Sequence, residues 1–202
     1  MAMASAGGLI VAVFAMSSGF EGETVSDVND AKTMGDVLGL PSYGTASLNG
    51  YFVYAFELNG TLYRAVAPIT QELSDQIFEL DFDDPEYEEK YNALVAPLAI
   101  DHIDDLNAMV PPQEELDAYI GKTVGEMMDE GWEYGWGYNL EEKTISMSYG
   151  LFSYNVGYEG ELDNGNGEIE LEEEDFRPLT VTSVAYEGLG NMTADLEAEM
   201  EG

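Results

Sequence analysis

The sequence predicts an α+β protein built as two tandem units, each with short helices followed by a small antiparallel β-sheet. Three observations lead to this prediction. A strand–turn–strand pattern occupies residues 51–66, aromatic residues alternate with small or polar ones at 132–138, and one helix-start motif recurs ninety positions later. The 202 residues, 45% of them hydrophobic, are sufficient for two small domains that each have a core.

The charge of the chain restricts its partners. It contains 41 Asp and Glu residues against six Lys and Arg, which gives a formal net charge of −35. Nucleic acid and anionic membrane surfaces are excluded, because both attract basic side chains. Basic proteins, cationic peptides and divalent cations remain open, and a solvated surface explains most of the acids. No cysteine is present, so disulfides, thiolate metal sites and cysteine nucleophiles are excluded.

Residues 1–22 read as a signal-like or anchor segment. No charge occurs from Met1 to Phe20, and the apolar run Leu9–Met16 precedes the small residues 17–19. This order is typical of a secretory signal, although the basic start of such a signal is missing. A buried N-terminal strand or helix is the alternative. The expected location is therefore secreted or at the cell envelope.

The first unit is expected over residues 23–110. Thr33 is the predicted N-cap of a helix over 34–38, and Gly39 would end it in a left-handed conformation. Asn59-Gly60 between two β-rich runs predicts a two-residue hairpin turn. Its register places one set of side chains in the core: Phe52, Tyr54, Phe56, Leu58 and Tyr63. On the other face, Glu57 and Arg64 are expected to form a cross-strand charge pair.

The rest of the first unit reads as helices over 74–80, capped by Ser74, and 85–94, followed by a strand over 97–103. The second unit is expected over 111–190. It begins with a helix over 113–119 and a second helix over 124–130, which Thr123 caps and Gly131 stops. Strands follow at 132–138, 144–149, 152–158 and 178–186, and an acidic loop lies at 163–175. Residues 191–202 are expected to be a frayed tail or loose helix.

The two units contain matching segments. The motif 32–38 corresponds to 122–128 position by position, and 97–103 corresponds to 178–184 with a shorter spacing. This duplicated order of helices and a meandering sheet resembles the β-lactamase inhibitor protein fold, and the Lys-Thr-x-Gly-acid helix that ends in Gly-Trp is similar to uncharacterised secreted proteins of Gram-positive bacteria. The resemblance implies protein–protein binding, and it assigns no binding residue.

The aromatic row is the candidate binding site, with the residues Trp132, Tyr134, Trp136 and Tyr138. Exposed on a sheet, these rings would form a platform for a glycan or peptide. The alternative is that they supply core area, which aromatic residues at a spacing of two commonly do.

Other chemistry is weakly supported. The single histidine, His102, lies beside carboxylates and is expected to be a structural or surface residue. Residues 163–169 suggest a calcium loop, but Leu162 occupies the position of the first ligand, so an acidic turn is expected instead. Paired carboxylates are too numerous to indicate a glycosidase site. No catalytic residue, metal site or cofactor is predicted.

We therefore expect a non-enzymatic, secreted or cell-envelope binding protein whose partner is a protein, peptide or glycan at the cell surface. A carboxylate-dependent hydrolase and a cation-binding surface protein are the alternatives.

Overall fold

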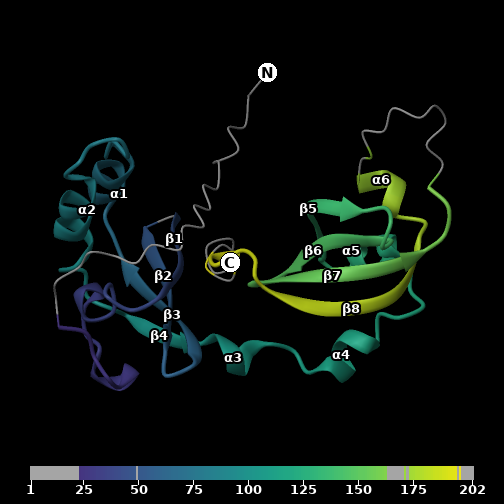
Figure 1. Cartoon of the computed structure of the whole chain (residues 1–202), viewed down its shortest axis with the longest axis horizontal. Helices are drawn as coiled ribbons and strands as arrows, with labels where there is room; N and C mark the ends of the chain where they lie inside the picture. The colour runs from purple at the N-terminus through teal and green to yellow at the C-terminus, as the bar shows by residue number, and fades with distance from the viewer. Residues whose placement is uncertain (1–22, 49, 163–170, 172, 195, 197–202) are drawn as a thin grey trace. The chain divides into compact units, whose positions relative to one another are not determined.

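The computed structural model describes residues 23–48, 50–162, 171, 173–194 and 196. These form two compact units, each with its own four-stranded antiparallel sheet (Figure 1), so the predicted α+β class with two tandem units is confirmed. The first unit contains the described residues up to Met109 together with Leu196, and the second runs from Val110 to Ala194. The predicted signal or anchor at 1–22 and the suggested calcium loop at 163–169 lie outside the described residues.

The sheet of the first unit consists of three consecutive strands that form a meander and a fourth strand that follows two helices. The sheet order is β1-β2-β3-β4. Figure 1 shows α1 and α2 together beside this sheet. In chain order, the elements are η1 (Val28–Asp30), η2 (Met34–Asp36), β1 (Ser42–Leu48), β2 (Tyr51–Leu58), β3 (Thr61–Pro68), α1 (Gln71–Phe78), α2 (Tyr87–Val95), β4 (His102–Asp105) and α3 (Leu106–Met109).

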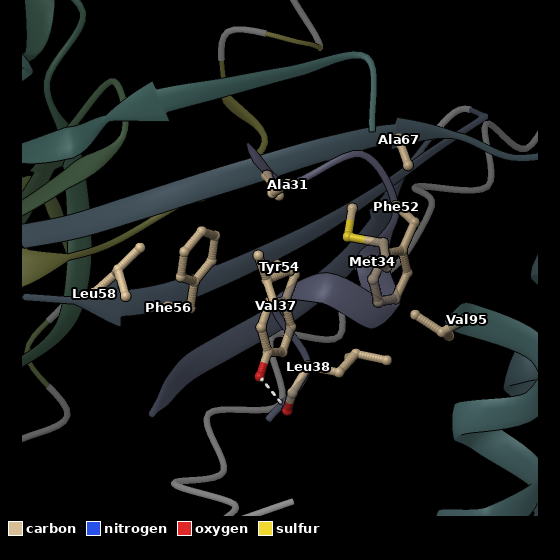
Figure 2. Close-up of a cluster of buried hydrophobic side chains, with 11 residues drawn as sticks. Ala31, Met34, Val37, Leu38, Phe52, Tyr54, Phe56, Leu58, Ala67 and Val95 are labelled. Atoms are coloured by element: carbon tan, nitrogen blue, oxygen red, sulfur yellow. Dashed lines mark hydrogen bonds between the residues drawn. The ribbon is translucent and has the colours of Figure 1, made fainter. Parts of the chain in front are cut away.

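The predicted hairpin and core face are confirmed. Leu58 pairs with Thr61 across the two-residue turn, and Asn59 and Gly60 both have positive φ, as a type I′ turn requires. The core side chains of β2 face residues from η2, and the Tyr54 hydroxyl donates to the carbonyl oxygen of Leu38 at 3.2 Å (Figure 2). Ile77 of α1 and Tyr91 and Val95 of α2 complete this core.

Several boundaries in this unit differ from the prediction. Helix α1 begins at Gln71, not Ser74, because the Thr70 hydroxyl accepts a hydrogen bond from the backbone N–H of Leu73. The segment at 34–38 is only a 3-10 turn, and Gly39 is not among the described glycines with positive φ. The strand expected over 97–103 begins at His102, although Ala99 forms an isolated bridge with Thr33.

The expected Glu57–Arg64 charge pair is wrong. Glu57 accepts a hydrogen bond from the Tyr43 hydroxyl at 2.7 Å. Arg64 instead donates from Nε and Nη2 to one oxygen of Asp104, at 2.9 and 2.6 Å. The reason is the fourth strand, which places Asp104 directly opposite Arg64 on β4. Because Arg64 is only 1% exposed, this bond neutralises a buried charge.

The second unit repeats the same order of strands. Its sheet order is β5-β6-β7-β8, with a short helix between the third and fourth strands. The hairpin around Gly150 and the helix that Thr123 caps are confirmed. The elements are α4 (Gln113–Asp117), α5 (Val124–Asp129), β5 (Glu133–Asn139), β6 (Thr144–Tyr149), β7 (Phe152–Glu159), α6 (Glu173–Phe176) and β8 (Thr180–Leu189).

Helix α5 begins with a capping box. The Thr123 hydroxyl accepts from the N–H of Glu126 at 3.1 Å, and the Glu126 carboxylate accepts from the N–H of Thr123 at 2.7 Å. In the first unit, Asp36 accepts from the N–H of Thr33 at 2.7 Å. Gly131 follows α5 with a φ of 97°, so a glycine ends the helix as predicted.

In both units, backbone hydrogen bonds join this helix start to the segment that leads into the fourth strand. The bonded residues of the two units match each other at the same offsets as the matching segments of the sequence. In the first unit, Ile100 donates to Lys32, Met34 to Leu98 and Gly35 to Ala96; in the second, Val181 donates to Lys122, Val124 to Leu179 and Gly125 to Arg177. The bridge Thr33–Ala99 likewise has a counterpart in Thr123–Thr180.

Residues 191–202 were expected to be a frayed tail or loose helix, and most of residues 195–202 lie outside the described structure. Of the residues described there, Met192, Thr193 and Leu196 are buried. No helix in the described ranges is both long enough and apolar enough to cross a membrane.

Candidate binding surface at strand β5

Strand β5, which carries most of the predicted aromatic row, is an edge strand of the second sheet. Its pairing with β6 is irregular. Tyr134 pairs with Met147 and Tyr138 with Ile145, so β5 bulges between these two tyrosines. Gly135 permits the bulge, because a Cβ there would lie 2.8 Å from the carbonyl oxygen of Ser146.

The bulge separates the four predicted site residues. Trp132 lies just before β5 and is only 3% exposed, so its indole belongs to the core. Tyr134 is half-buried, whereas Tyr138 is 38% exposed. Trp136 lies within the bulge, and its side chain is outside the described part of the structure. The row is therefore not one flat platform, and Tyr138 is its described member at the surface.

Tyr134 and Tyr138 both pack on Phe176 of α6. Their ring centroids lie 5.4 and 5.5 Å from that of Phe176, which is fully buried, and Tyr158 makes an edge contact with the same ring at 6.0 Å. The sequence analysis missed Phe176 because it follows a run of acids. The internal match could have identified it. The offset that relates 97–103 to 178–184 also relates Val95 to Phe176, and both residues are fully buried.

A second aromatic cluster surrounds Trp132. Tyr149 stacks on the indole at 5.1 Å with an interplanar angle of 20°, and Tyr119 and Tyr154 contact it at 5.0 and 4.9 Å. Tyr149 is 42% exposed, so its ring separates the buried indole from solvent. The buried Trp132 Nε1 and Tyr154 hydroxyl have no hydrogen-bond partner among the described residues.

Carboxylates lie at both ends of β5. Glu133 begins the strand, and the turn that follows it carries Glu141 and Glu142, all three exposed. The Asn139 side chain accepts from the backbone N–H groups of Glu141 and Glu142 at 3.0 and 3.2 Å and so fixes this turn. None of the ion pairs among the described residues involves these three carboxylates. Leu140, which is 42% exposed, is a second exposed apolar residue at this end of the strand.

Burial raises the pKa of Tyr134, and the neighbouring phenols of Tyr138 and Tyr158 raise it further. The Tyr134 hydroxyl is therefore neutral at physiological pH. It can donate or accept a hydrogen bond but adds no charge to the surface.

His102 lies in the first unit and is 43% exposed. Its Nδ1 is 2.9 Å from Asp101 Oδ2, and its Nε2 is 3.7 Å from the Asp104 carboxylate that Arg64 holds. Among the described residues, no serine or threonine hydroxyl forms a hydrogen bond with His102. The arrangement orients an imidazole without supplying a nucleophile for it to activate.

The described carboxyl groups whose pKa departs from the ordinary value are Asp27, Asp36 and Asp84. All three have a lowered pKa, because backbone or side-chain N–H groups donate to them. A general acid needs the opposite shift. No group of three metal-ligating side chains occurs in the part of the chain that the structure describes.

No protein-family model, curated protein or solved structure matches this chain.

Proposed function

We propose that this protein is a non-enzymatic binding module, exposed outside the cell or at its envelope, that binds a basic segment of a protein or peptide at β5. The observation that carries the proposal is the position of Tyr138. Its ring is partly exposed at a sheet edge, is held in place by buried Phe176 and lies on the strand that Glu133 begins and the acidic turn follows.

The physical reason is that partly exposed aromatic rings on a rigid base act as anchors for binding. Tyrosine is enriched among the residues that dominate interface energies, since it contributes large contact area at a small entropic cost. The exposed carboxylates at the two ends of the strand attract Lys and Arg and repel acidic partners. An edge strand also presents backbone groups that an extended peptide can pair with.

The test measures binding of twelve-residue peptides that contain several Lys or Arg residues and one aromatic residue. Neutral peptides of the same length serve as the reference. We expect the cationic peptides to bind, and Tyr138→Ala to weaken binding about tenfold or more, as the loss of an interface tyrosine commonly does. The affinity should also fall with added salt.

Tyr186→Ala is the matched control. Tyr186 is also 38% exposed, but it lies on β8, the opposite edge of the same sheet. The Tyr186→Ala substitution should leave the affinity for the cationic peptides unchanged. Equal losses in the two variants, or equal binding of neutral and cationic peptides, would refute the proposed surface.

We also infer that the two units are copies of one motif. The matching hydrogen bonds of Gly35 and Gly125 and the matching bridges of Thr33 and Thr123 support this inference. Exchange of the acids in the helix starts, by Asp36→Glu and Glu126→Asp, should leave the unfolding temperature nearly unchanged. Asp36→Ala and Glu126→Ala should each lower it.

A further inference from the structure

The connection between α1 and α2 in the first unit carries two strongly exposed aromatic rings. Phe82 is 66% exposed and Phe78, the last residue of α1, is 55% exposed, the largest fractions among the large hydrophobic side chains that the structure describes. The two helices contribute Ile77, Tyr91 and Val95 to the core, and neither phenylalanine belongs to it. The core is therefore complete without these two rings.

Phe82 is held by a row of rings that leads into the core. Its ring centroid lies 4.8 Å from that of Tyr87, which stacks on Tyr91 at 5.9 Å. Tyr91 in turn contacts Phe52, a core residue that is only 2% exposed, at 6.4 Å. Packing of this kind limits the rotation of an exposed ring, so Phe82 loses little side-chain entropy when a partner covers it.

Hydrogen bonds also order the backbone around Phe82. The N–H of Asp84 donates to the carbonyl oxygen of Asp81 at 3.0 Å, and the N–H of Tyr87 donates to that of Asp84 at 2.9 Å. The Asp81 carboxylate accepts from the N–H of Asp83 at 3.0 Å. The exposed ring is therefore carried by an ordered turn.

The same connection is strongly acidic. Its exposed carboxylates, continuing into α2, are those of Glu79, Asp81, Asp83, Glu86, Glu88 and Glu89. Lys90 is the only basic residue from Gln71 to Val95, and it pairs with Asp84 at 2.6 Å and with Glu86 at 3.2 Å. The other five exposed carboxylates take part in no ion pair within the described part of the chain. Exposed apolar side chains among polar ones are typical of an interaction surface.

We propose that the α1–α2 connection is a docking surface for a cationic amphipathic helix of another polypeptide, in addition to the surface proposed at β5. The apolar face of such a helix covers Phe78 and Phe82, and Lys or Arg side chains along its borders pair with the carboxylates. A helix of this kind presents both chemistries within one short segment, because residues three and four apart share a face.

Charge complementarity selects this occupant over the others. A second copy of this chain, with a net charge of −35, is repelled, and an anionic membrane surface is repelled for the same reason. A neutral apolar segment covers the rings but desolvates nearby carboxylates without supplying a partner for them.

The test compares two peptides of identical composition. One is an eighteen-residue helix of Lys and Leu with every Leu on one face, and the other is its scrambled isomer. We expect the amphipathic peptide to bind more tightly, and Phe82→Ala to weaken its binding about tenfold or more, as loss of an aromatic anchor commonly does. Circular dichroism shows whether the variant keeps its fold.

Tyr43→Ala is the matched control in the same unit. Tyr43 is 48% exposed and bonds the carboxylate of Glu57, but it lies on β1. Its substitution should leave the affinity unchanged, and so should Tyr138→Ala. A loss of binding in Tyr138→Ala without a loss in Phe82→Ala would overturn the α1–α2 surface and leave β5 standing, so the two proposals fail separately.

A second measurement does not depend on substitutions in the protein. A benzophenone on the apolar face of the amphipathic peptide is activated by light, and the crosslinked fragments are identified by mass spectrometry. We expect crosslinks within residues 77–91. Equal binding of the two isomers, equal affinities of Phe82→Ala and Tyr43→Ala, or crosslinks confined to residues 110–194 would overturn the proposal.

Discussion

Gly35 donates its backbone N–H to the carbonyl oxygen of Ala96 across 2.9 Å, and a Cβ at Gly35 would lie 3.2 Å from that oxygen. Gly125 makes the same 2.9 Å bond to Arg177, where its Cβ would lie 3.1 Å from the acceptor. In each unit, the first helical turn lies very close to the backbone that precedes the last strand. A side chain at the glycine position would have to push that backbone away. The glycine in the repeated motif therefore serves packing, since neither residue has a positive φ.

Substitution of these glycines should destabilise the protein. Gly35→Ala and Gly125→Ala should each lower the free energy of unfolding by about 1–3 kcal/mol, the usual cost of an overpacked contact. Chemical denaturation monitored by tryptophan fluorescence and circular dichroism measures the change. Gly137→Ala is the control, because a Cβ there would have no atom within 4 Å. Equal effects at all three positions would contradict the steric explanation.

Loss of the Asp104 carboxylate beside Arg64 should destabilise the protein. Asp104→Asn keeps the shape of the side chain but replaces a charge-assisted bond to a guanidinium that is 1% exposed. We expect the free energy of unfolding to fall by about 2–3 kcal/mol, since a buried guanidinium loses a charge-assisted bond to a carboxylate. Asp84→Asn, which removes one of the two carboxylates beside the exposed Lys90, should have little effect. Similar losses in the two variants would show that burial of Arg64 does not matter.

Two buried tyrosine hydroxyls should behave differently when deleted. Tyr54→Phe removes the bond to Leu38 and should lower the free energy of unfolding by about 1 kcal/mol. The Tyr154 hydroxyl has no partner among the described residues, so Tyr154→Phe should be neutral or stabilising by up to about 1 kcal/mol. Thermal and denaturant unfolding of both variants provides the comparison. A larger loss for Tyr154→Phe would reveal a partner, such as an ordered water molecule.

Alkaline pH should weaken the fold through the buried phenols. Burial raises the pKa of Tyr154 to about 12 and also raises that of Tyr54, Tyr158 and Tyr186. The folded state therefore keeps protons that the unfolded chain loses near its ordinary pKa of about 10. Stability from these groups is complete below about pH 10 and falls as the pH rises toward 12.

The measurement is the unfolding midpoint in urea as a function of pH. Tyr154→Phe should reduce the decline between about pH 10 and 12. Tyr43→Phe provides the comparison at a surface phenol, because Tyr43 is 48% exposed and its hydroxyl donates to Glu57. A midpoint that stays constant over this range would contradict the expected contribution of buried phenols.

Much of the fold was predictable because its local signals are strong. Asn59-Gly60 fixes one hairpin, and Thr123, Glu126 and Gly131 define both ends of α5. Alternation of apolar residues then identifies the core face of β2. These features depend on residues close together in the sequence, so a single sequence contains the necessary information.

Features that depend on distant residues were not predictable in the same way. Arg64 bonds Asp104 of β4 because the fourth strand pairs with β3, and the sequence alone favoured a neighbour on β2. The aromatic row reads as regular alternation, yet the bulge at Gly135 interrupts it because β5 pairs with β6 only at both ends. Burial of Trp132 likewise depends on Tyr119, Tyr149 and Tyr154, which come from other segments.

The bridges Thr33–Ala99 and Thr123–Thr180 join the opening and closing residues of each unit. Contacts between such distant positions carry a large loop-closure entropy, so they slow folding and form late. On a ribosome, neither unit can complete its structure until its closing strand has left the exit tunnel. A nascent chain stalled before Ala99 would contain the residues of the buried first core but would lack β4, so the edge of β3 would remain unpaired at this stage of synthesis.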